Sequence, residues 1–83
     1  MAARDYYQEA HRLALLLNQD GLPDWATRFE EAISVGFTAT EILMALRWHV
    51  QQLKNARLHL SAETRRQLER LLAGLDEVLE SPR

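Results

Sequence analysis

The chain contains no cysteine, which excludes disulfides, thiolate nucleophiles and cysteine metal sites. Long apolar runs are also missing, because the longest, residues 13–17, is far short of the roughly 20 residues that span a membrane. The first residues show no signal-peptide pattern. We therefore expect a cytoplasmic protein with no membrane partner.

Strand patterns and internal repeats are absent as well, so the apolar residues must be organised by helices. Apolar residues make up 47% of the 83 residues, an ordinary fraction for a globular protein and too high for a disordered one. A chain of this length forms one domain, residues 1–83. It buries only about 60–65% of its unfolded surface, so we expect modest stability.

Four stretches carry apolar residues at helical spacing and are separated by short joints. They predict helices over residues 3–18, 24–35, 39–58 and 62–80. Gly21 and Pro23 mark the first joint, and Gly36 suits a left-handed stop after the second helix. Four amphipathic helices with short joints predict an all-α, single-domain antiparallel bundle.

The start of the third helix carries the clearest local signal in the chain. Thr38 and Glu41 have the spacing of a capping box, in which each side chain accepts a hydrogen bond from the backbone amide of the other residue. Phe37 and Ile42 have the spacing of a hydrophobic staple across the same start. Ser61 is the expected N-cap of the fourth helix.

The third helix is apolar on more than one side. At about 100° per residue, one side gathers the residues expected to face the bundle: Ile42, Leu43, Leu46, Val50 and Leu53. Met44 and Trp48 lie nearly opposite, one turn apart. Two interpretations stay open: other helices cover this second side, or Met44 and Trp48 form an exposed contact patch. Trp25, in the second helix, is expected in the core.

No group of side chains has the spacing of a catalytic or metal site. His11, His49 and His59 form no pair at i,i+3 or i,i+4, and His49 is expected to be packed and hydrogen-bonded. Glu30 and Glu31 are adjacent and point to different sides of a helix, so they cannot act as an acid–base pair. We expect a protein that is not an enzyme and needs no cofactor.

Charge is segregated along the sequence. Residues 20–41 hold five carboxylates and one arginine, a net charge of −4. Residues 42–71 hold six basic and two acidic residues, a net charge of +4. The acidic block could complement a basic partner, because charge complementarity speeds association and adds specificity. Its carboxylates are Asp20, Asp24, Glu30, Glu31 and Glu41.

Residues 31–45 resemble the helix-turn-helix signature of DNA-binding proteins. The resemblance rests on five positions: Ala32, Gly36, Phe37, Thr38 and Ile42. Of the positions that would face the DNA groove, Leu43 and Met44 are apolar and only Arg47 is basic. The preceding helix is acidic and would repel phosphates. Nucleic acid is therefore not the expected partner, and DNA-binding regulation is kept as an alternative.

The run GFTATEILMALRWHVQQL, from Gly36 onward, resembles a segment of small bacterial helical proteins of the immunity type, which neutralise toxins. The resemblance implies a small cytoplasmic protein that binds a toxin domain and blocks its active site. We expect this partner to be basic. A structural module that forms homodimers through Met44 and Trp48 is a further alternative. The expected partner-binding residues are Asp20, Asp24, Glu30, Glu31, Glu41, Met44 and Trp48.

Overall fold

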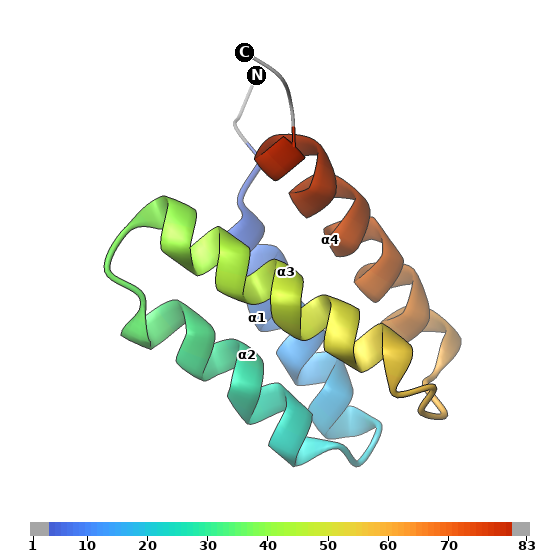
Figure 1. Ribbon diagram of the computed structural model, residues 1–83. Helices are drawn as coiled ribbons and strands as arrows, with labels where there is room; N and C mark the ends of the chain where they lie inside the picture. Colours follow the sequence, from blue (N-terminus) through green and yellow to red (C-terminus); the bar gives the residue numbers. More distant parts are fainter. Residues whose placement is uncertain (1–3, 81–83) are drawn as a thin grey trace.

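The computed structural model describes residues 4–80, and within them it contains four α-helices and no strand. Figure 1 shows these helices running back and forth as an antiparallel bundle. Their bounds are α1, Tyr6–Gln19; α2, Pro23–Val35; α3, Ala39–Asn55; and α4, Ala62–Glu80. The predicted all-α four-helix fold is confirmed.

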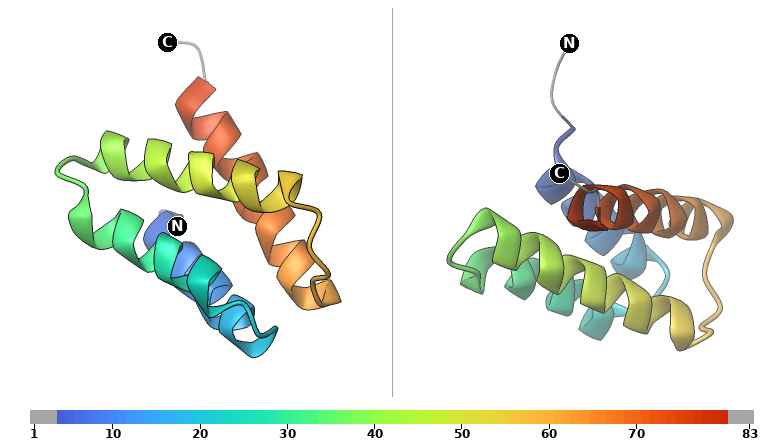
Figure 2. Two further views of the ribbon diagram at one scale, coloured as in Figure 1. Left: turned by 60° about the horizontal axis from the view of Figure 1, so that its bottom comes forward. Right: turned by 45° about the horizontal axis from the view of Figure 1, so that its top comes forward.

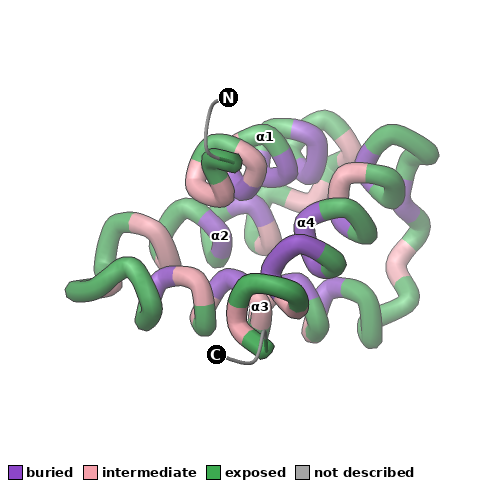
Figure 3. The backbone as a smooth tube through the Cα atoms, turned by 90° about the horizontal axis from the view of Figure 1, so that it is seen from above, coloured by how far each residue is buried: buried purple, intermediate pink, exposed green. Residues whose placement is uncertain are grey.

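The helices pack in a ring in which each contacts two neighbours: α1 with α2, α2 with α3, α3 with α4, and α4 with α1. Figure 3 shows their buried sides facing one another across the centre. The fully buried large side chains come from all four helices: Leu13, Leu17, Phe29, Leu46, Val50, Leu53, Leu68, Leu71 and Leu75. The outward side of each helix is left without a neighbour within the ring.

The predicted bounds of α4 agree with the structure, and those of α1 need correction by a few residues. Asp5 caps α1, since its side chain accepts a hydrogen bond from the Gln8 amide at 3.1 Å, and the helix starts at Tyr6. The predicted start at residue 3 lies outside the described residues. Helix α4 ends at Glu80, as predicted.

Helix α3 starts as predicted and ends earlier. The capping box is complete, with Glu41 N donating to Thr38 Oγ1 at 3.1 Å and Thr38 N donating to Glu41 Oε1 at 3.2 Å. The predicted end at residue 58 is wrong, because the helix stops at Asn55. Arg57 has φ of 54°, a left-handed conformation that cannot continue a right-handed helix.

The α2–α3 turn differs from the prediction in two ways. Gly36 is extended, with φ −69° and ψ 146°, so it is not a left-handed stop. A Cβ at this position would overlap Ile42 Cγ1, so glycine is needed here for close approach. The predicted staple is also absent, because Phe37 is 93% exposed while Ile42 is buried.

The opposite end of the bundle joins two connections that are far apart in the sequence. Asp20, after α1, accepts a hydrogen bond from the Ser61 amide at 3.0 Å. This bond lowers the pKa of Asp20 below its ordinary value. Ser61 in turn caps α4 as predicted, accepting from the Thr64 amide at 3.2 Å. Figure 2 shows the α1–α2 turn and the α3–α4 linker at the same end.

At the other end, residues near the start of α1 bind α4. The Tyr6 hydroxyl donates to the Gly74 carbonyl at 3.3 Å, and Arg4 Nη2 donates to the Arg70 carbonyl at 2.9 Å. Arg4 also pairs with Glu9 at 2.6 Å. A Cβ on Gly74 would overlap the Arg4 guanidinium. The glycine inside α4 therefore has a packing role, which offsets its low helix propensity.

We expect Gly74→Ala to have opposite consequences with and without Arg4. In the Arg4→Ala background the alanine should stabilise the protein by about 1 kcal/mol, the usual gain over glycine in a helix. In the wild type the added methyl displaces the guanidinium, and the gain should be largely cancelled. Urea unfolding of the two single variants and the double variant measures this coupling. Equal stabilisation in both backgrounds would show that Arg4 does not occupy this position.

Candidate protein-binding surface

Met44 and Trp48 lie on the outward side of α3, where no other helix of the ring covers them. Their exposed fractions are 55% and 54%, whereas Leu46 and Val50 on the opposite side of the helix are fully buried. Of the two interpretations left open by the sequence, the exposed one agrees with the described residues, which leave more than half of each side chain uncovered. Contiguous exposed apolar patches often mark interaction sites, whereas single exposed apolar side chains are ordinary.

A groove of about 340 Å³ runs beside these two residues, between α2 and α3. Its lining consists of Arg28, Glu31, Ala32, Val35, Gly36, Ala45 and His49. Two of these residues, Ala32 and Ala45, have small side chains that leave the groove open. Val35, 65% exposed, lies at its edge, and Phe37 follows in the turn. We call the groove together with Phe37, Glu41, Met44 and Trp48 the α2–α3 face.

His49 joins the core to the α2–α3 face. Its ring packs edge-on against Phe29 at 6.0 Å and against Trp48 at 5.0 Å between ring centres. The expected packing is present, but Nδ1 is buried and has no hydrogen-bond partner among residues 4–80. Burial lowers the pKa of His49, and the positive charge of Arg28 lowers it further, while Glu31 opposes the shift. His49 therefore favours the neutral form.

The lowered pKa of His49 predicts a loss of stability in mild acid. Protonation favours the unfolded chain, so the contribution of His49 is complete above its ordinary pKa of 6.5 and falls as the pH decreases toward the folded value. We expect the free energy of unfolding to drop less between pH 7.5 and pH 5 in His49→Gln than in the wild type. Urea titrations at both pH values measure this drop in the free energy of unfolding.

His59→Gln is the matched control for this prediction, because His59 is exposed and lies outside the α2–α3 face. His59→Gln should reduce the pH dependence less than His49→Gln does. An unchanged pH dependence in His49→Gln would contradict the assignment.

The five predicted carboxylates do not form one surface. Glu31 lines the α2–α3 groove, and Glu41 lies one turn before Met44 on α3. Glu30 lies on the other side of α2 and contacts His11 Nδ1 at 2.7 Å. Asp24 is exposed in the first turn of α2, and Asp20 binds the Ser61 amide. Only Glu31 and Glu41 therefore accompany Met44 and Trp48.

Trp25 is half-buried, whereas the sequence predicted a core position. Its ring packs against the core and also contacts the Arg28 guanidinium, which lies 4.2 Å from the ring centre. This cation–π contact holds Arg28 beside the groove.

The three helix-turn-helix positions that were expected to face a DNA groove have different surroundings. Arg47, the one basic residue among them, contacts Glu80 at 3.0 Å and Asp76 at 3.6 Å on α4. Leu43 packs against the core. Met44 alone of the three projects into solvent, and a thioether does not read base edges.

The sequence did not predict that α2 forms one wall of the groove, with Ala32 and Val35 in its lining. Val35 was the last residue of a predicted helix, and Phe37 was explained as a staple. The available signal was the pair of bulky apolar residues around Gly36, outside the regular stripe of α2.

Within residues 4–80 there is no cluster of three or more potential metal ligands, and no helix has the length and apolarity to cross a membrane.

No protein-family model matches the chain, and no curated protein or solved structure matches it significantly.

Proposed function

We propose that the chain is a protein-binding inhibitor of the immunity or antitoxin type, which neutralises a bacterial toxin domain by direct contact through the α2–α3 face. The observation that carries this proposal is the exposure of Met44 and Trp48 on a helix whose opposite side is fully buried. Tryptophan supplies binding energy at many protein interfaces, and methionine adapts to the partner's shape.

The charge around this face favours a basic partner. Glu31 and Glu41 lie beside the two apolar anchors, and the Arg28 guanidinium is held against Trp25. Carboxylates at the rim of an interface speed association with a basic surface and reject acidic competitors. Burial of Met44 and Trp48 would then determine how slowly the complex dissociates. Inhibition needs no catalytic group from this chain, because covering the toxin's active site is sufficient.

The experiment starts from capture and ends in a growth assay. Immobilised wild-type protein is used to capture proteins from an extract of the native host, and each captured protein is expressed with and without this chain. We expect one of them to stop growth when expressed alone and to be tolerated when co-expressed. If every captured protein is harmless alone, or if none is neutralised, the proposal is wrong.

Variants then locate the contact. Trp48→Ala should weaken the complex by about 30-fold or more, the effect of losing an interface hot spot. Leu15→Ala is the matched control, because Leu15 is an equally exposed apolar residue on α1, and it should change affinity less than about threefold. Comparable losses of affinity in both variants would show that the toxin does not bind through the α2–α3 face.

Glu30 and Glu31 provide a second matched pair, since they are adjacent but face different neighbours. Glu31→Lys should slow association with a basic toxin by about tenfold at low salt, and the difference should shrink as salt is added. Glu30 lies toward α1, so Glu30→Lys should have little effect on the association rate. The opposite ranking would place the partner on the α1 side.

A homodimer through the same face is the second candidate, because a two-fold axis beside Trp48 would bury the exposed anchors of both copies. Sedimentation equilibrium decides this point. A monomer at several hundred micromolar excludes the homodimer, and a dimer that Trp48→Ala dissociates would support it over the inhibitor.

A further inference from the structure

A second surface, on the opposite side of the ring, has the reverse charge. Because α1 contacts α2 and α4, and α3 contacts the same two helices, the boundary between α1 and α4 lies across the bundle from the boundary between α2 and α3. Figure 3 shows α1 and α3 on opposite sides, with α2 and α4 between them. The two boundaries can therefore be occupied at the same time.

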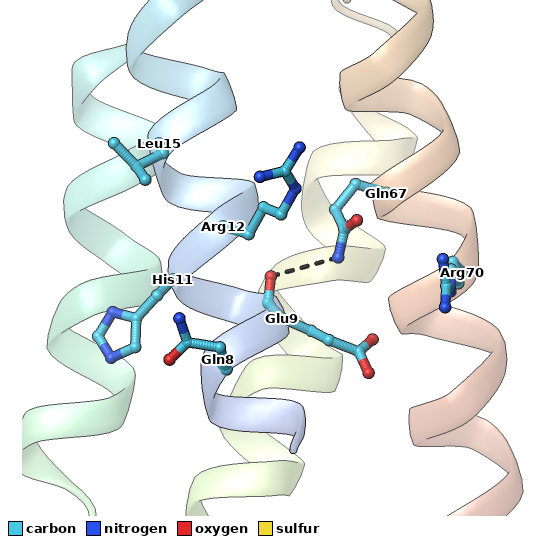
Figure 4. Close-up of a pocket in the computed structure, with 7 residues that line it drawn as sticks. All are labelled: Gln8, Glu9, His11, Arg12, Leu15, Gln67 and Arg70. Atoms are coloured by element: carbon cyan, nitrogen blue, oxygen red, sulfur yellow. Dashed lines mark hydrogen bonds between the residues drawn. The ribbon is translucent and has the colours of Figure 1, made fainter. Parts of the chain in front are cut away.

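A groove of about 430 Å³ follows the α1–α4 boundary, and it continues into a neighbouring hollow of about 340 Å³. Arg12, Gln67 and Arg70 line both parts, and Arg66 lines the larger one. Figure 4 shows Arg12 and Gln67 extending from the two helices into the space between them, with Arg70 on α4 beside it. We call this surface the arginine groove.

The charges of α4 explain why the arginine groove has an excess of positive charge. The carboxylates of Glu69, Asp76 and Glu80 lie toward α3, where they pair with Lys54 and Arg47. They are thereby removed from the side of α4 that faces α1. Among residues 4–80, no carboxylate forms an ion pair with Arg66 or Arg70.

The two carboxylates that lie in the groove are already engaged. Glu63 pairs with Arg12 at 2.9 Å, and Glu9 pairs with Arg4 at 2.6 Å. Gln67 is anchored by its amide, which donates to the Glu9 carbonyl at 3.4 Å. The guanidiniums of Arg66 and Arg70 are spaced at i,i+4 on one side of α4, so both can bind carboxylates of a single ligand.

We infer that the arginine groove binds an acidic peptide segment that carries one apolar side chain. Guanidinium groups bind carboxylates through two parallel hydrogen bonds, and Arg66 and Arg70 are free to do so. Leu15, 59% exposed at the α1 edge of the groove, offers a contact for an aliphatic or aromatic side chain. A nucleic acid fits less well, since a phosphate backbone offers no aliphatic side chain for the exposed Leu15.

This site is separate from the α2–α3 face and does not depend on the proposed inhibition. An acidic segment here and a basic domain there would make the chain a bridge between two proteins of opposite charge. The acidic segment could belong to the same partner only if that partner reached around the bundle.

The test uses a synthetic twelve-residue peptide rich in aspartate and glutamate with one central leucine, and the full chain labelled for NMR. At low salt we expect shift changes in α1 and α4 around Leu15, Gln67 and Arg70, and none at Trp48. Arg66→Glu combined with Arg70→Glu should weaken binding by at least about tenfold. Leu15→Ala should weaken it by about threefold.

Arg65→Glu is the matched control, because it reverses a charge on α4 outside the groove lining, and it should change affinity less than about twofold. A peptide with the central leucine replaced by serine should bind like the Leu15→Ala variant binds the original. A twelve-nucleotide single-stranded DNA is the competing probe.

Three outcomes would overturn the inference: no peptide binding by the wild type at low salt, equal losses in Arg65→Glu and the double variant, or tighter binding of the DNA than of the peptide. Each of these outcomes is independent of the toxin experiment, because the peptide test uses no toxin and no Trp48 variant.

Discussion

Replacing Leu46 with alanine is expected to lower the free energy of unfolding by about 3–5 kcal/mol, a large part of the stability of a small domain. Leu46 is fully buried at the middle of α3, where all four helices supply neighbouring core side chains. The loss combines the transfer energy of the removed atoms with the cavity left behind. The melting temperature should fall by at least about 10 °C, measured by circular dichroism or calorimetry.

Met44→Ala is the matched control on the same helix. The side chain is more than half exposed, so its removal should change the free energy of unfolding by less than about 1 kcal/mol. The contrast between positions 44 and 46 measures directly which side of α3 is packed within the chain. Similar losses at the two positions would mean that Met44 is covered in solution, for example by a second copy, and the homodimer would then be favoured.

The second large effect is expected at Gly36. Its φ of −69° is accessible to any residue, so alanine would stabilise the protein by about 0.4–1 kcal/mol if space were available. The added Cβ instead overlaps Ile42 Cγ1. We therefore expect Gly36→Ala to destabilise the protein by about 1–3 kcal/mol, the usual cost of overpacking. Urea unfolding gives both the sign and the size.

The Ile42→Ala background tests the cause. Without the isoleucine side chain, Gly36→Ala should become neutral or stabilising, since only the overlap opposes it. Gly21→Ala serves as a comparison of a different kind. Gly21 has φ of 82° and open space around it, so its cost of about 1–2 kcal/mol should persist in the Ile42→Ala background. Persistence of the Gly36→Ala cost there would refute the steric explanation.

The helices and the core side of each could be predicted because they depend on spacing along the chain. Leu46 and Leu53 lie two turns apart and must face the same way in any helix. The Thr38 capping box was equally predictable, because both of its partners lie within four residues. The end of α3 was not, since Arg57 adopts a left-handed conformation that its residue type does not favour.

The candidate sites were harder, because exposure depends on which helices become neighbours. Met44 and Trp48 could be paired from their spacing, but only the ring arrangement leaves that side of α3 uncovered. Phe37 had the spacing of a staple, yet the extended backbone at Gly36 directs the ring outward. The arginine groove needs α1 and α4 side by side, and Arg12 and Arg66 are 54 positions apart in the sequence.

The bonds from Arg4 and Tyr6 to α4 join segments that are far apart in the sequence. Their partners, Arg70 and Gly74, follow 66 and 68 residues later in the chain. During synthesis α1 can meet α2 early, but its second neighbour does not exist until α4 has left the ribosome. Closing so long a loop is entropically costly and slows folding. Until then, the apolar side of α1 that later contacts α4 stays exposed.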